Sequence, residues 1–403
     1  MQIRSDFCII MVYAQPGRRA LPSFLRRIHD TTMKVSDMKK IAILGGGLTG
    51  RLLAFLLAEQ SIRVTLFEAD NREGAGSAAY IAAAMLAPLA EAVEATPLVT
   101  ALGKHSVAAW RTILARLPQP VFLQESGSLV VWHGQDKPLA KQFEQHLTRA
   151  WQGNSPAEIW QAEQLSSHEP QLAGRFQTAF YLPDEGQLDN RQVLSALAAG
   201  LEQLGIDCRW QTTASPDSLR QEYDWVIDCR GHGAQADWNR HPSAASRLRG
   251  VRGEVARVYA PEVSLNRPVR LLHPRYPLYI APKQDHLFVI GATQLESESR
   301  APASVRSGLE LLSALYAVHP AFGEAHILEL AASLRPTLNH HNPEIRFNRQ
   351  RQTVELNGLF RHGFMISPAV CAAAARLVCH LLDGSTVPQQ DEASGLTFDE
   401  CPA

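Results

Sequence analysis

Four residues in the first part of the chain have the types and the spacing that suit phosphate and ribose binding. Gly45, Gly47 and Gly50 follow the pattern G-x-G-x-x-G, and Glu68 comes 21 residues after Gly47. The first glycine permits a tight turn, the second lets the backbone approach a pyrophosphate, and the third allows a helix to pack closely on a strand. A carboxylate in the position of Glu68 suits the two hydroxyl groups of an adenosine ribose. The pattern therefore predicts dinucleotide binding, and by itself it does not distinguish FAD from NAD.

The elements around this pattern are those that such a site requires. Residues 41–44 are a short apolar run, typical of a strand buried on both faces, and residues 51–60 are rich in the helix formers Leu and Ala. Residues 63–67 have the pattern of a second parallel strand, which Glu68 ends. The alternative is a glycine-rich turn in an ordinary βαβ unit. Because the strand, the helix and the acid are all in register, the nucleotide site is favoured.

Helical and strand-like patterns alternate along the rest of the chain. Asp189 or Asn190 is a suitable N-cap for a helix that ends at Gly205, and Gly231 follows a buried strand in a turn that we expect beside the cofactor. Alternation within residues 251–293 indicates an antiparallel sheet, unlike the parallel opening. We expect helices at 96–117, 137–152, 157–165, 191–204, 304–318 and 369–382, strands at 180–182, 206–211, 224–230, 326–333 and 353–357, a hairpin at 122–132 and a loop at 358–368.

The composition sets outer limits on the kind of protein. The chain has 403 residues, of which 45% are hydrophobic and 20% charged, so it can form a large core and is not globally disordered. Its formal net charge is −1 and it has no long basic run, which argues against binding to nucleic acid. Six scattered cysteines without a C-x-x-C pair indicate reduced thiols of a cytoplasmic protein, and neither a disulfide framework nor a metal site.

Two further features concern the N-terminus and membranes. No stretch approaches 18 consecutive apolar residues, so no membrane span is expected. In residues 1–37 an apolar patch precedes most of the arginines, which is the reverse of the order in a secretory signal. We therefore expect a disordered N-terminal extension, with the functional chain starting at Met33 or Met38.

An ordered series of segments resembles the D-amino-acid oxidase superfamily of FAD-dependent enzymes. The chain is most similar to the bacterial glycine oxidases of thiamine (thiazole) biosynthesis. The matching segments cover the chain from about Lys40 to Leu382 in the order found in the family. They are GGGLTG with Glu68, AAAMLAP at 82–88, GQLDNRQVLSAL at 186–197, VIDCRGHGA at 226–234, RGVRGEV at 249–255, LYIAPK at 278–283, VIGAT at 289–293, SLRP at 333–336 and NGLFRHGFMISPA at 357–369.

The resemblance implies a fold class and a division into domains. The fold is α/β, with a Rossmann-like FAD-binding domain interleaved with an α+β substrate domain on a mixed, largely antiparallel sheet. The FAD-binding domain takes residues 38–90, 176–248 and 327–385, and the substrate domain takes 91–175 and 249–326. Residues 386–403 are a C-terminal tail.

The resemblance also implies three substrate-binding residues. An amino-acid oxidase must hold a small zwitterion with its Cα–H against the flavin, and a planar guanidinium is the best holder of a carboxylate. Arg335 matches the family's carboxylate-binding arginine, Tyr279 matches a tyrosine whose hydroxyl contacts the carboxylate, and Arg361 matches a second arginine near substrate and flavin. From the residues alone, each arginine is more typical of a surface or ion-pair residue, and Tyr279 could equally be a core aromatic. No catalytic residue beyond the flavin is required.

Non-covalent FAD is the cofactor that the resemblance implies. The expected contacts come from three parts of the chain. One lies near the adenosine and pyrophosphate, one lies beside the flavin, and one is a loop that closes over the isoalloxazine. The expected cofactor-binding residues are Gly45, Gly47, Leu48, Thr49, Gly50, Glu68, Ala69, Ala78, Ala79, Ala83, Met85, Gly231, Leu359, Phe360, Arg361, His362, Gly363, Phe364 and Met365.

The expected activity is oxidative deamination of glycine or another small amino acid, with molecular oxygen as acceptor and hydrogen peroxide as product. Two alternatives stay open: an oxidase or dehydrogenase of another primary or secondary amine, including a modified tRNA base, and a catalytically weak flavoprotein. The number of subunits, with a homo-oligomer among the options, is open too. Some residues depart from the family pattern: Lys283 stands where Arg is usual, Ala84 replaces a frequent glycine, His362 replaces a common Asn, and residues 339–345 read NHHNPEI.

Overall fold

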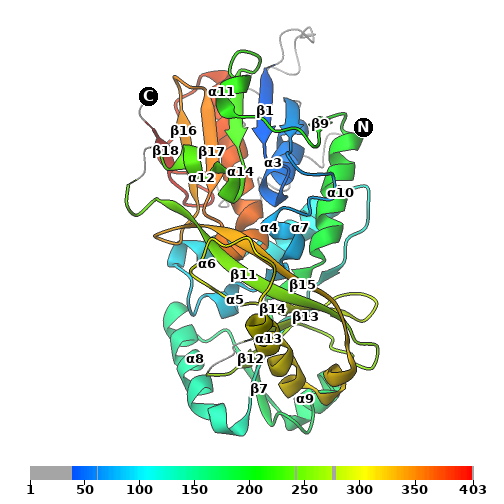
Figure 1. Ribbon diagram of the computed structural model, residues 1–403. Helices are drawn as coiled ribbons and strands as arrows, with labels where there is room; N and C mark the ends of the chain where they lie inside the picture. Colours follow the sequence, from blue (N-terminus) through cyan, green and yellow to red (C-terminus); the bar gives the residue numbers. More distant parts are fainter. Residues whose placement is uncertain (1–38, 61, 241–242, 275–277, 402–403) are drawn as a thin grey trace, which may run out of the picture.

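The structure, a computed structural model, describes residues 39–60, 62–240, 243–274 and 278–401. A seven-stranded sheet forms one half of the molecule, with strand order β18-β16-β17-β10-β1-β2-β9 (Figure 1). Five adjacent strands, from β17 to β9, are parallel, while β16 runs antiparallel to β17. The strands are β1 (Lys40–Leu44), β2 (Arg63–Phe67), β9 (Asp207–Arg209), β10 (Trp225–Asp228), β16 (Glu344–Asn348), β17 (Thr353–Asn357) and β18 (Phe398–Glu400).

The centre of this sheet explains its sequence pattern. β1 lies between β2 and β10, and Ile41, Ala42 and Ile43 are fully buried. A strand covered on both faces needs apolar side chains at every position, which is why its pattern is continuous rather than alternating. The predicted strands at 63–67 and 353–357 have the observed bounds, whereas those at 206–211 and 224–230 are shorter in the structure.

Three long helices pack beside this sheet. They are α3 (Leu48–Ala58), α10 (Asn190–Gln203) and α14 (Gly363–Asp383), and α6 (Pro97–Gly103) and α7 (Ser106–Leu114) pack on α14. Within the described residues, Phe360–Asp383 is the one helical segment long and apolar enough to cross a membrane, but 78% of its most apolar window is buried inside the molecule. This burial identifies it as a core helix in the structure.

The other half of the molecule is built on an eight-stranded sheet of order β15-β11-β14-β13-β12-β5-β7-β6. All of its neighbouring pairs are antiparallel except β12 with β5. The strands are β5 (Ser128–Trp132), β6 (Glu158–Gln161), β7 (Thr178–Leu182), β11 (Leu248–Tyr259), β12 (Val269–Leu272), β13 (Leu278–Pro282), β14 (Leu287–Gly291) and β15 (His326–Leu338). The expected combination of a parallel nucleotide-type sheet with a mixed, largely antiparallel sheet is confirmed.

A small sheet and short helices connect the two halves. The small sheet has the order β3-β8-β4, formed by β3 (Met85–Leu86), β8 (Gly186–Leu188) and β4 (Leu123–Gln124). The remaining α-helices are α4 (Ala78–Ile81), α5 (Pro88–Glu91), α8 (Lys137–Ala150), α9 (Ala162–His168), α11 (Pro216–Leu219), α12 (Gln235–Trp238) and α13 (Val305–Val318). The 3-10 turns are η2 (Gly134–Asp136), η3 (Gly231–Ala234), η4 (Pro320–Glu324) and η5 (Phe360–His362).

Three predictions for residues 96–165 were wrong. Residues 122–132 are not a hairpin, because β4 pairs with β8 while β5 pairs with β7 and β12, and the chain changes sheets at Gly127 with φ +75°. The segment predicted as a helix at 157–165 begins with strand β6, in which Trp160 stacks on Tyr181 with ring centroids 4.3 Å apart. The helix predicted at 96–117 is divided into α6 and α7.

The loop predicted at 358–368 is largely helical, and a tryptophan explains how. Pro368 lies inside α14, where its missing N–H leaves the carbonyl of Phe364 without its helical partner. The indole Nε1 of Trp110 donates to that carbonyl at 2.7 Å. The helix can therefore begin at Gly363, ahead of Pro368.

The sheets also shift the expected domain limits. β7 and β15 belong to the eight-stranded sheet, although residues 176–248 and 327–385 were assigned to the FAD-binding domain. The segment assigned to a C-terminal tail supplies β18, the edge strand beside β16. Long-range pairing of this kind leaves no local pattern in the sequence. The N-terminal extension expected at residues 1–37 lies outside the described residues.

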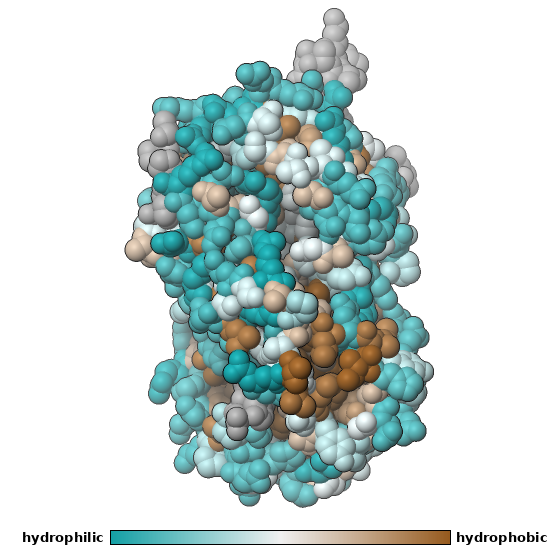
Figure 2. Space-filling model, viewed as in Figure 1, coloured by the Kyte–Doolittle hydropathy of each residue, from teal (hydrophilic) through white to brown (hydrophobic). Residues whose placement is uncertain are grey.

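One face of the eight-stranded half exposes large apolar side chains. They gather over α13 and the adjacent part of the edge strand β15 (Figure 2). The side chains are Val305, Leu309, Tyr316, Ile327, Leu328 and Leu330, with exposed fractions from 40% to 81%. Exposed apolar surface of this extent is typical of protein–protein contacts, and the homo-oligomer remains a prediction.

Candidate functional site

A cavity of about 1170 Å³ extends from the glycine-rich turn to the eight-stranded sheet. This is larger than the roughly 300–1,000 Å³ that is usual for small-ligand sites, and its length suits an extended cofactor with a substrate at one end. Every residue that the sequence analysis proposed for the site lines this cavity, except Gly50. The structure thus brings together segments that lie more than 300 residues apart in the chain, such as Gly45 and Phe364.

The glycine-rich turn has the geometry that its spacing predicts. Gly45 has φ +95°, and a Cβ atom there would lie 2.7 Å from the carbonyl oxygen of Cys229. A Cβ atom on Gly50 would lie 1.9 Å from the carbonyl oxygen of Gly45, so this glycine serves packing rather than lining the cavity. Gly47 is the N-cap of α3, and no side chain caps the helix there. The N-terminal N–H groups of α3 therefore remain available to an anion in the cavity.

Two charged side chains fix this turn. The Glu68 carboxylate, at the end of β2, accepts from the backbone N–H of Gly46 and from that of Asp70 at 2.7 Å. Below the turn, buried Arg51 donates to the carbonyl oxygens of Gly46 at 2.5 Å and of Leu194 at 2.7 Å. Burial lowers the pKa of Arg51 to about 10. Both side chains hold the turn rigid, and a carboxylate has further lone pairs with which to accept from ribose hydroxyls.

These residues fit a dinucleotide cofactor. The cradle is built from glycines that a Cβ atom would fill, the helix N-terminus is uncapped, and an acidic side chain closes the end of β2. Farther along the cavity, Ala78, Ala79 and Ala83 leave room for backbone to approach a flat ring. The cavity then ends at the residues proposed to hold the substrate.

Arg335 and Tyr279 lie over this end of the cavity because two glycines make space for them. The guanidinium of Arg335, on β15, covers Gly253 of β11, where a Cβ atom would lie 2.2 Å from Cζ. The hydroxyl of Tyr279, on β13, covers Gly291 of β14, where a Cβ atom would lie 2.6 Å from Oη. Nη1 of Arg335 donates to the carbonyl oxygen of Thr293 at 3.0 Å. Both side chains are half-buried, so they are fixed in position and still face the cavity.

The electrostatics of this pair suit a carboxylate ligand. Burial lowers the pKa of Arg335, but a guanidinium stays protonated at neutral pH. Burial raises the pKa of Tyr279, so its hydroxyl remains a hydrogen-bond donor. Among the described residues, Arg335 has no carboxylate within ion-pair distance. Its positive charge is therefore available to a bound anion.

Arg361 has a different environment, centred on Glu91 of α5. Its Nε lies 3.0 Å from Oε2 of Glu91, and its Nη2 lies 2.7 Å from Oε2 of Glu94. Glu91 also contacts Arg270 of β12 at 2.7 Å and Nε2 of His362 at 2.9 Å. Burial would raise the pKa of Glu91, but Arg361 and Arg270 outweigh it and hold that pKa well below the ordinary range. Arg361 lines the cavity, yet its charge is already neutralised.

Several residues of the site were not predicted from the sequence. Glu91, Glu94 and Arg270 belong to no motif, and only the fold brings them to Arg361. Gly253 and Gly291 did lie within the matching segments RGVRGEV and VIGAT. A glycine in an otherwise alternating strand often marks close approach of another group, and that signal could have identified both positions.

Replacement of Glu91 by Gln is expected to destabilise the protein by about 2–4 kcal/mol, because Arg270 and Arg361 lose their shared carboxylate in a partly buried place. Thermal unfolding of the purified variant measures this. The depressed pKa means that the ionised Glu91 contributes stability above the ordinary carboxyl range, and that this contribution is lost as the pH falls toward the folded-state pKa. The difference between wild type and variant should therefore shrink in acid.

The matched control is Glu94→Gln. Glu94 pairs with the same Arg361, but its side chain is 68% exposed, so its loss should cost less than about 1 kcal/mol. Equal destabilisation by the two substitutions would show that Glu91 has no special role.

Comparison with known proteins gives a consistent result. The family model described as DAO, FAD dependent oxidoreductase, matches residues 40–377. The putative thiamine biosynthesis oxidoreductase ThiO of Rhizobium etli is 39% identical over 338 residues, which are 84% of this chain and 95% of that protein. The bifunctional protein ThiO/ThiG of Trichormus variabilis is 24% identical over 354 residues, or 84% of this chain, which spans 52% of that protein's length.

Solved structures agree at the level of the fold. The crystal structure of glycine oxidase from Geobacillus kaustophilus superposes with a TM-score of 0.71 at 23% identity. The superposition covers 87% of this chain and 96% of that one.

Proposed function

Because this chain belongs to the family of FAD dependent oxidoreductases, we propose that it oxidises the amine of glycine or another small amino acid. The observation that carries the proposal is Arg335, a half-buried guanidinium without an ion-pair partner among the described residues, at the end of the cavity that begins at the glycine-rich turn. A guanidinium so placed binds one carboxylate in a bidentate pair. With Tyr279 as a second donor, the site fixes the carboxylate end of a zwitterion.

The chain's own contribution to the reaction is orientation. FAD held in this cavity would supply the acceptor for the hydride of the α-carbon, with molecular oxygen as the final oxidant and hydrogen peroxide as the product. Arg335 and Tyr279 fix the carboxylate, and the α-carbon then lies at a set distance from the cofactor part of the cavity. The Glu91 cluster closes the cavity with charges that are satisfied internally, so it adds no net competing anion. Imine that is not consumed in a further reaction hydrolyses with water to a 2-oxo acid and ammonia.

A biosynthetic role follows from the relatives' names. The Rhizobium etli relative is described as a thiamine biosynthesis oxidoreductase, and the match to this chain covers 95% of that relative. We propose that the imine from glycine supplies thiazole formation in this chain's pathway. Five cysteines in the described residues are free thiols, which suits the cytoplasmic location that we propose for this enzyme.

One observation favours a second candidate substrate. The same cavity is also lined by apolar side chains, among them Phe143, Leu272 and Leu311, which a molecule as small as glycine would leave uncovered. An N-alkyl amino acid such as sarcosine would place its substituent there. The net charge of −1 counts against a modified tRNA base.

Peroxide release by the purified, FAD-loaded protein tests both candidates. The panel consists of glycine, sarcosine, D-alanine, D-proline and simple amines without a carboxylate. Preference for glycine supports the first candidate, and preference for sarcosine or D-proline supports the second. Flavin reduction without peroxide would identify a dehydrogenase with another acceptor. Equal activity on amines that lack a carboxylate would contradict the assigned role of Arg335.

A further inference from the structure

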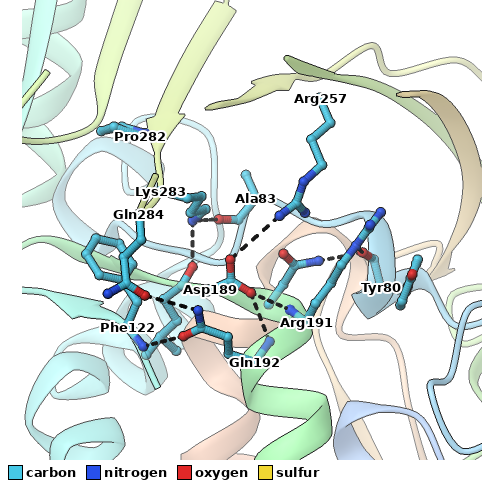
Figure 3. Close-up of polar contacts among 12 residues, drawn as sticks. Tyr80, Ala83, Phe122, Asp189, Arg191, Gln192, Arg257, Pro282, Lys283 and Gln284 are labelled. Atoms are coloured by element: carbon cyan, nitrogen blue, oxygen red, sulfur yellow. Dashed lines mark hydrogen bonds and ion pairs between the residues drawn. The ribbon is translucent and has the colours of Figure 1, made fainter. Parts of the chain in front are cut away.

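Lys283 is a buried amine that no step of the proposed reaction uses. It follows β13, and 7% of it is exposed. Its Nζ donates three hydrogen bonds, to the carbonyl oxygens of Ala83 at 2.8 Å and Leu188 at 2.5 Å and to Oε1 of Gln187 at 2.9 Å. Figure 3 shows the bond to Ala83. A protonated amine has three donors, so this arrangement uses all of them.

The partners of Lys283 carry no charge. The charged groups that face it are Asp189, which precedes α10, and Arg257 of β11, and they act in opposite directions. Asp189 is itself occupied, since it accepts from the N–H groups of Arg191 and Gln192 at 2.9 Å and lies 3.8 Å from Arg257. Burial among neutral acceptors lowers the pKa of Lys283 to about 7. The amine therefore gains and loses its proton near neutral pH.

The Ala83 carbonyl is the contact that links Lys283 to the cavity. Ala83 and Met85 line the cavity, and between them Ala84 has φ +52°, a left-handed conformation that is unfavourable for alanine. The N–H of Leu188 donates to the carbonyl of Ala84 at 3.0 Å, and Met85 pairs with Gln187 in the small sheet. The hydrogen bond from Lys283 holds the carbonyl just before the strained residue. This hydrogen bond thus links the end of β13, in the eight-stranded sheet, to the segment Ala83–Met85, which lines the cavity.

We propose that Lys283 is a positioning residue whose protonated amine holds the segment Ala83–Met85 in place for the cofactor, and whose deprotonation loosens that segment and weakens FAD binding. A neutral amine has two donors and one lone pair, so one of its three acceptors then meets a lone pair instead of an N–H. The inference concerns FAD rather than the substrate. It stands whichever amine the enzyme oxidises.

The effect on stability has the opposite sign, which separates the proposed role from a purely structural one. The folded-state pKa lies below the ordinary value of 10.5, so the unfolded chain binds more protons between about pH 7 and 10.5. The contribution of Lys283 to stability therefore rises with pH over this interval. FAD affinity is expected to fall instead, as the pH rises through the folded-state pKa of Lys283 near 7.

The test compares FAD dissociation constants of wild type, Lys283→Arg and Lys283→Met between pH 6 and pH 9. Loss of one charge-assisted hydrogen bond predicts an affinity of the wild type that falls by about tenfold or more as the pH rises. Lys283→Arg, whose guanidinium does not titrate, should bind FAD with little pH dependence, and Lys283→Met should bind weakly throughout. Lys141→Met, on the exposed face of α8, is the matched control and should behave as the wild type.

Other groups that titrate near neutral pH do not account for a difference in pH dependence between the variants. Glu185 and Glu355 have pKa values raised to about 7 by burial, but both are present in every variant. Parallel pH profiles for wild type and Lys283→Arg would overturn the proposal, as would tight binding by Lys283→Met at pH 6.

A measurement on the wild type alone covers the case in which neither variant folds. After correction for the intrinsic exchange rate, hydrogen exchange of the backbone amides in residues 83–87 should quicken between pH 6 and pH 8.5. Unchanged protection of this segment would overturn the proposal.

Discussion

Replacement of Arg335 by Ala is expected to lower kcat/KM for the amino-acid substrate while FAD stays bound. Removing one partner of a buried charge pair costs about 2–4 kcal/mol, which corresponds to a fall of roughly 30- to 1,000-fold. The guanidinium contacts only the carbonyls of Arg252 and Thr293 among the described residues, so its loss leaves no buried carboxylate without a partner. Steady-state kinetics measure the effect, and the ratio of flavin to protein measures retention of the cofactor.

Two controls separate substrate binding from general damage. Gly253→Ala keeps the arginine but places a Cβ atom 2.2 Å from its Cζ, so the guanidinium must move and the kinetic defect should resemble that of Arg335→Ala. Arg335→Lys keeps the charge without the bidentate geometry and should recover part of the loss. Unchanged kinetics in Arg335→Ala would remove this residue from the site.

Replacement of Gly50 by Ala is expected to abolish stable FAD binding. Its Cβ atom would lie 1.9 Å from the carbonyl oxygen of Gly45, a backbone atom that cannot move without opening the turn. Overpacking of this kind costs about 1–3 kcal/mol or more, so FAD affinity should fall roughly fivefold to 150-fold or more. Gel filtration followed by a flavin absorbance spectrum shows whether the cofactor stays with the protein.

Gly134→Ala is the control for Gly50→Ala. No atom lies within 4 Å of the added Cβ at Gly134, so this variant should retain FAD as the wild type does. Normal flavin content in Gly50→Ala would mean that the turn is not the phosphate cradle that its geometry indicates.

Local sequence patterns were enough to predict the first βαβ unit. β1, α3 and β2 form contiguous neighbours, and each carries a signal of its own: an apolar run, a helix-forming stretch and a terminal acid. The same holds for α10: its N-cap is Asp189, one of the two residues expected there, and Gly205 with φ +71° follows its end as expected. Where residues near in sequence decide a structure, propensity and periodicity suffice.

Pairing between distant segments could not be predicted in this way. β4 and β5 look like a hairpin, but each finds its partners elsewhere, and β18 joins the first sheet from the end of the chain. The helical start of α14 depends on Trp110, some 250 residues earlier. In each case the deciding contact is absent from the local sequence.

The residues of the candidate site likewise differ in whether local sequence could predict them. The glycine-rich turn and Glu68 were predicted from spacing, whereas Arg335 and Tyr279 were proposed through a family resemblance and their roles remain proposals. The cluster of Glu91, Arg270 and Arg361 was missed because its members come from α5, β12 and η5, which meet only in the folded chain. Lys283 was noted only as a departure from the family pattern, and its contacts became visible in the structure.

Anaerobic addition of glycine and related small amino acids to the FAD-loaded protein tests the central claim most directly, with the visible absorbance of the flavin as the signal. We predict that at least one of these amino acids bleaches the flavin with saturable concentration dependence, and that Arg335→Ala requires a much higher concentration of it. A flavin that stays oxidised with every amino acid and amine offered, in a protein that holds FAD firmly, would contradict the assignment as an amino-acid oxidase.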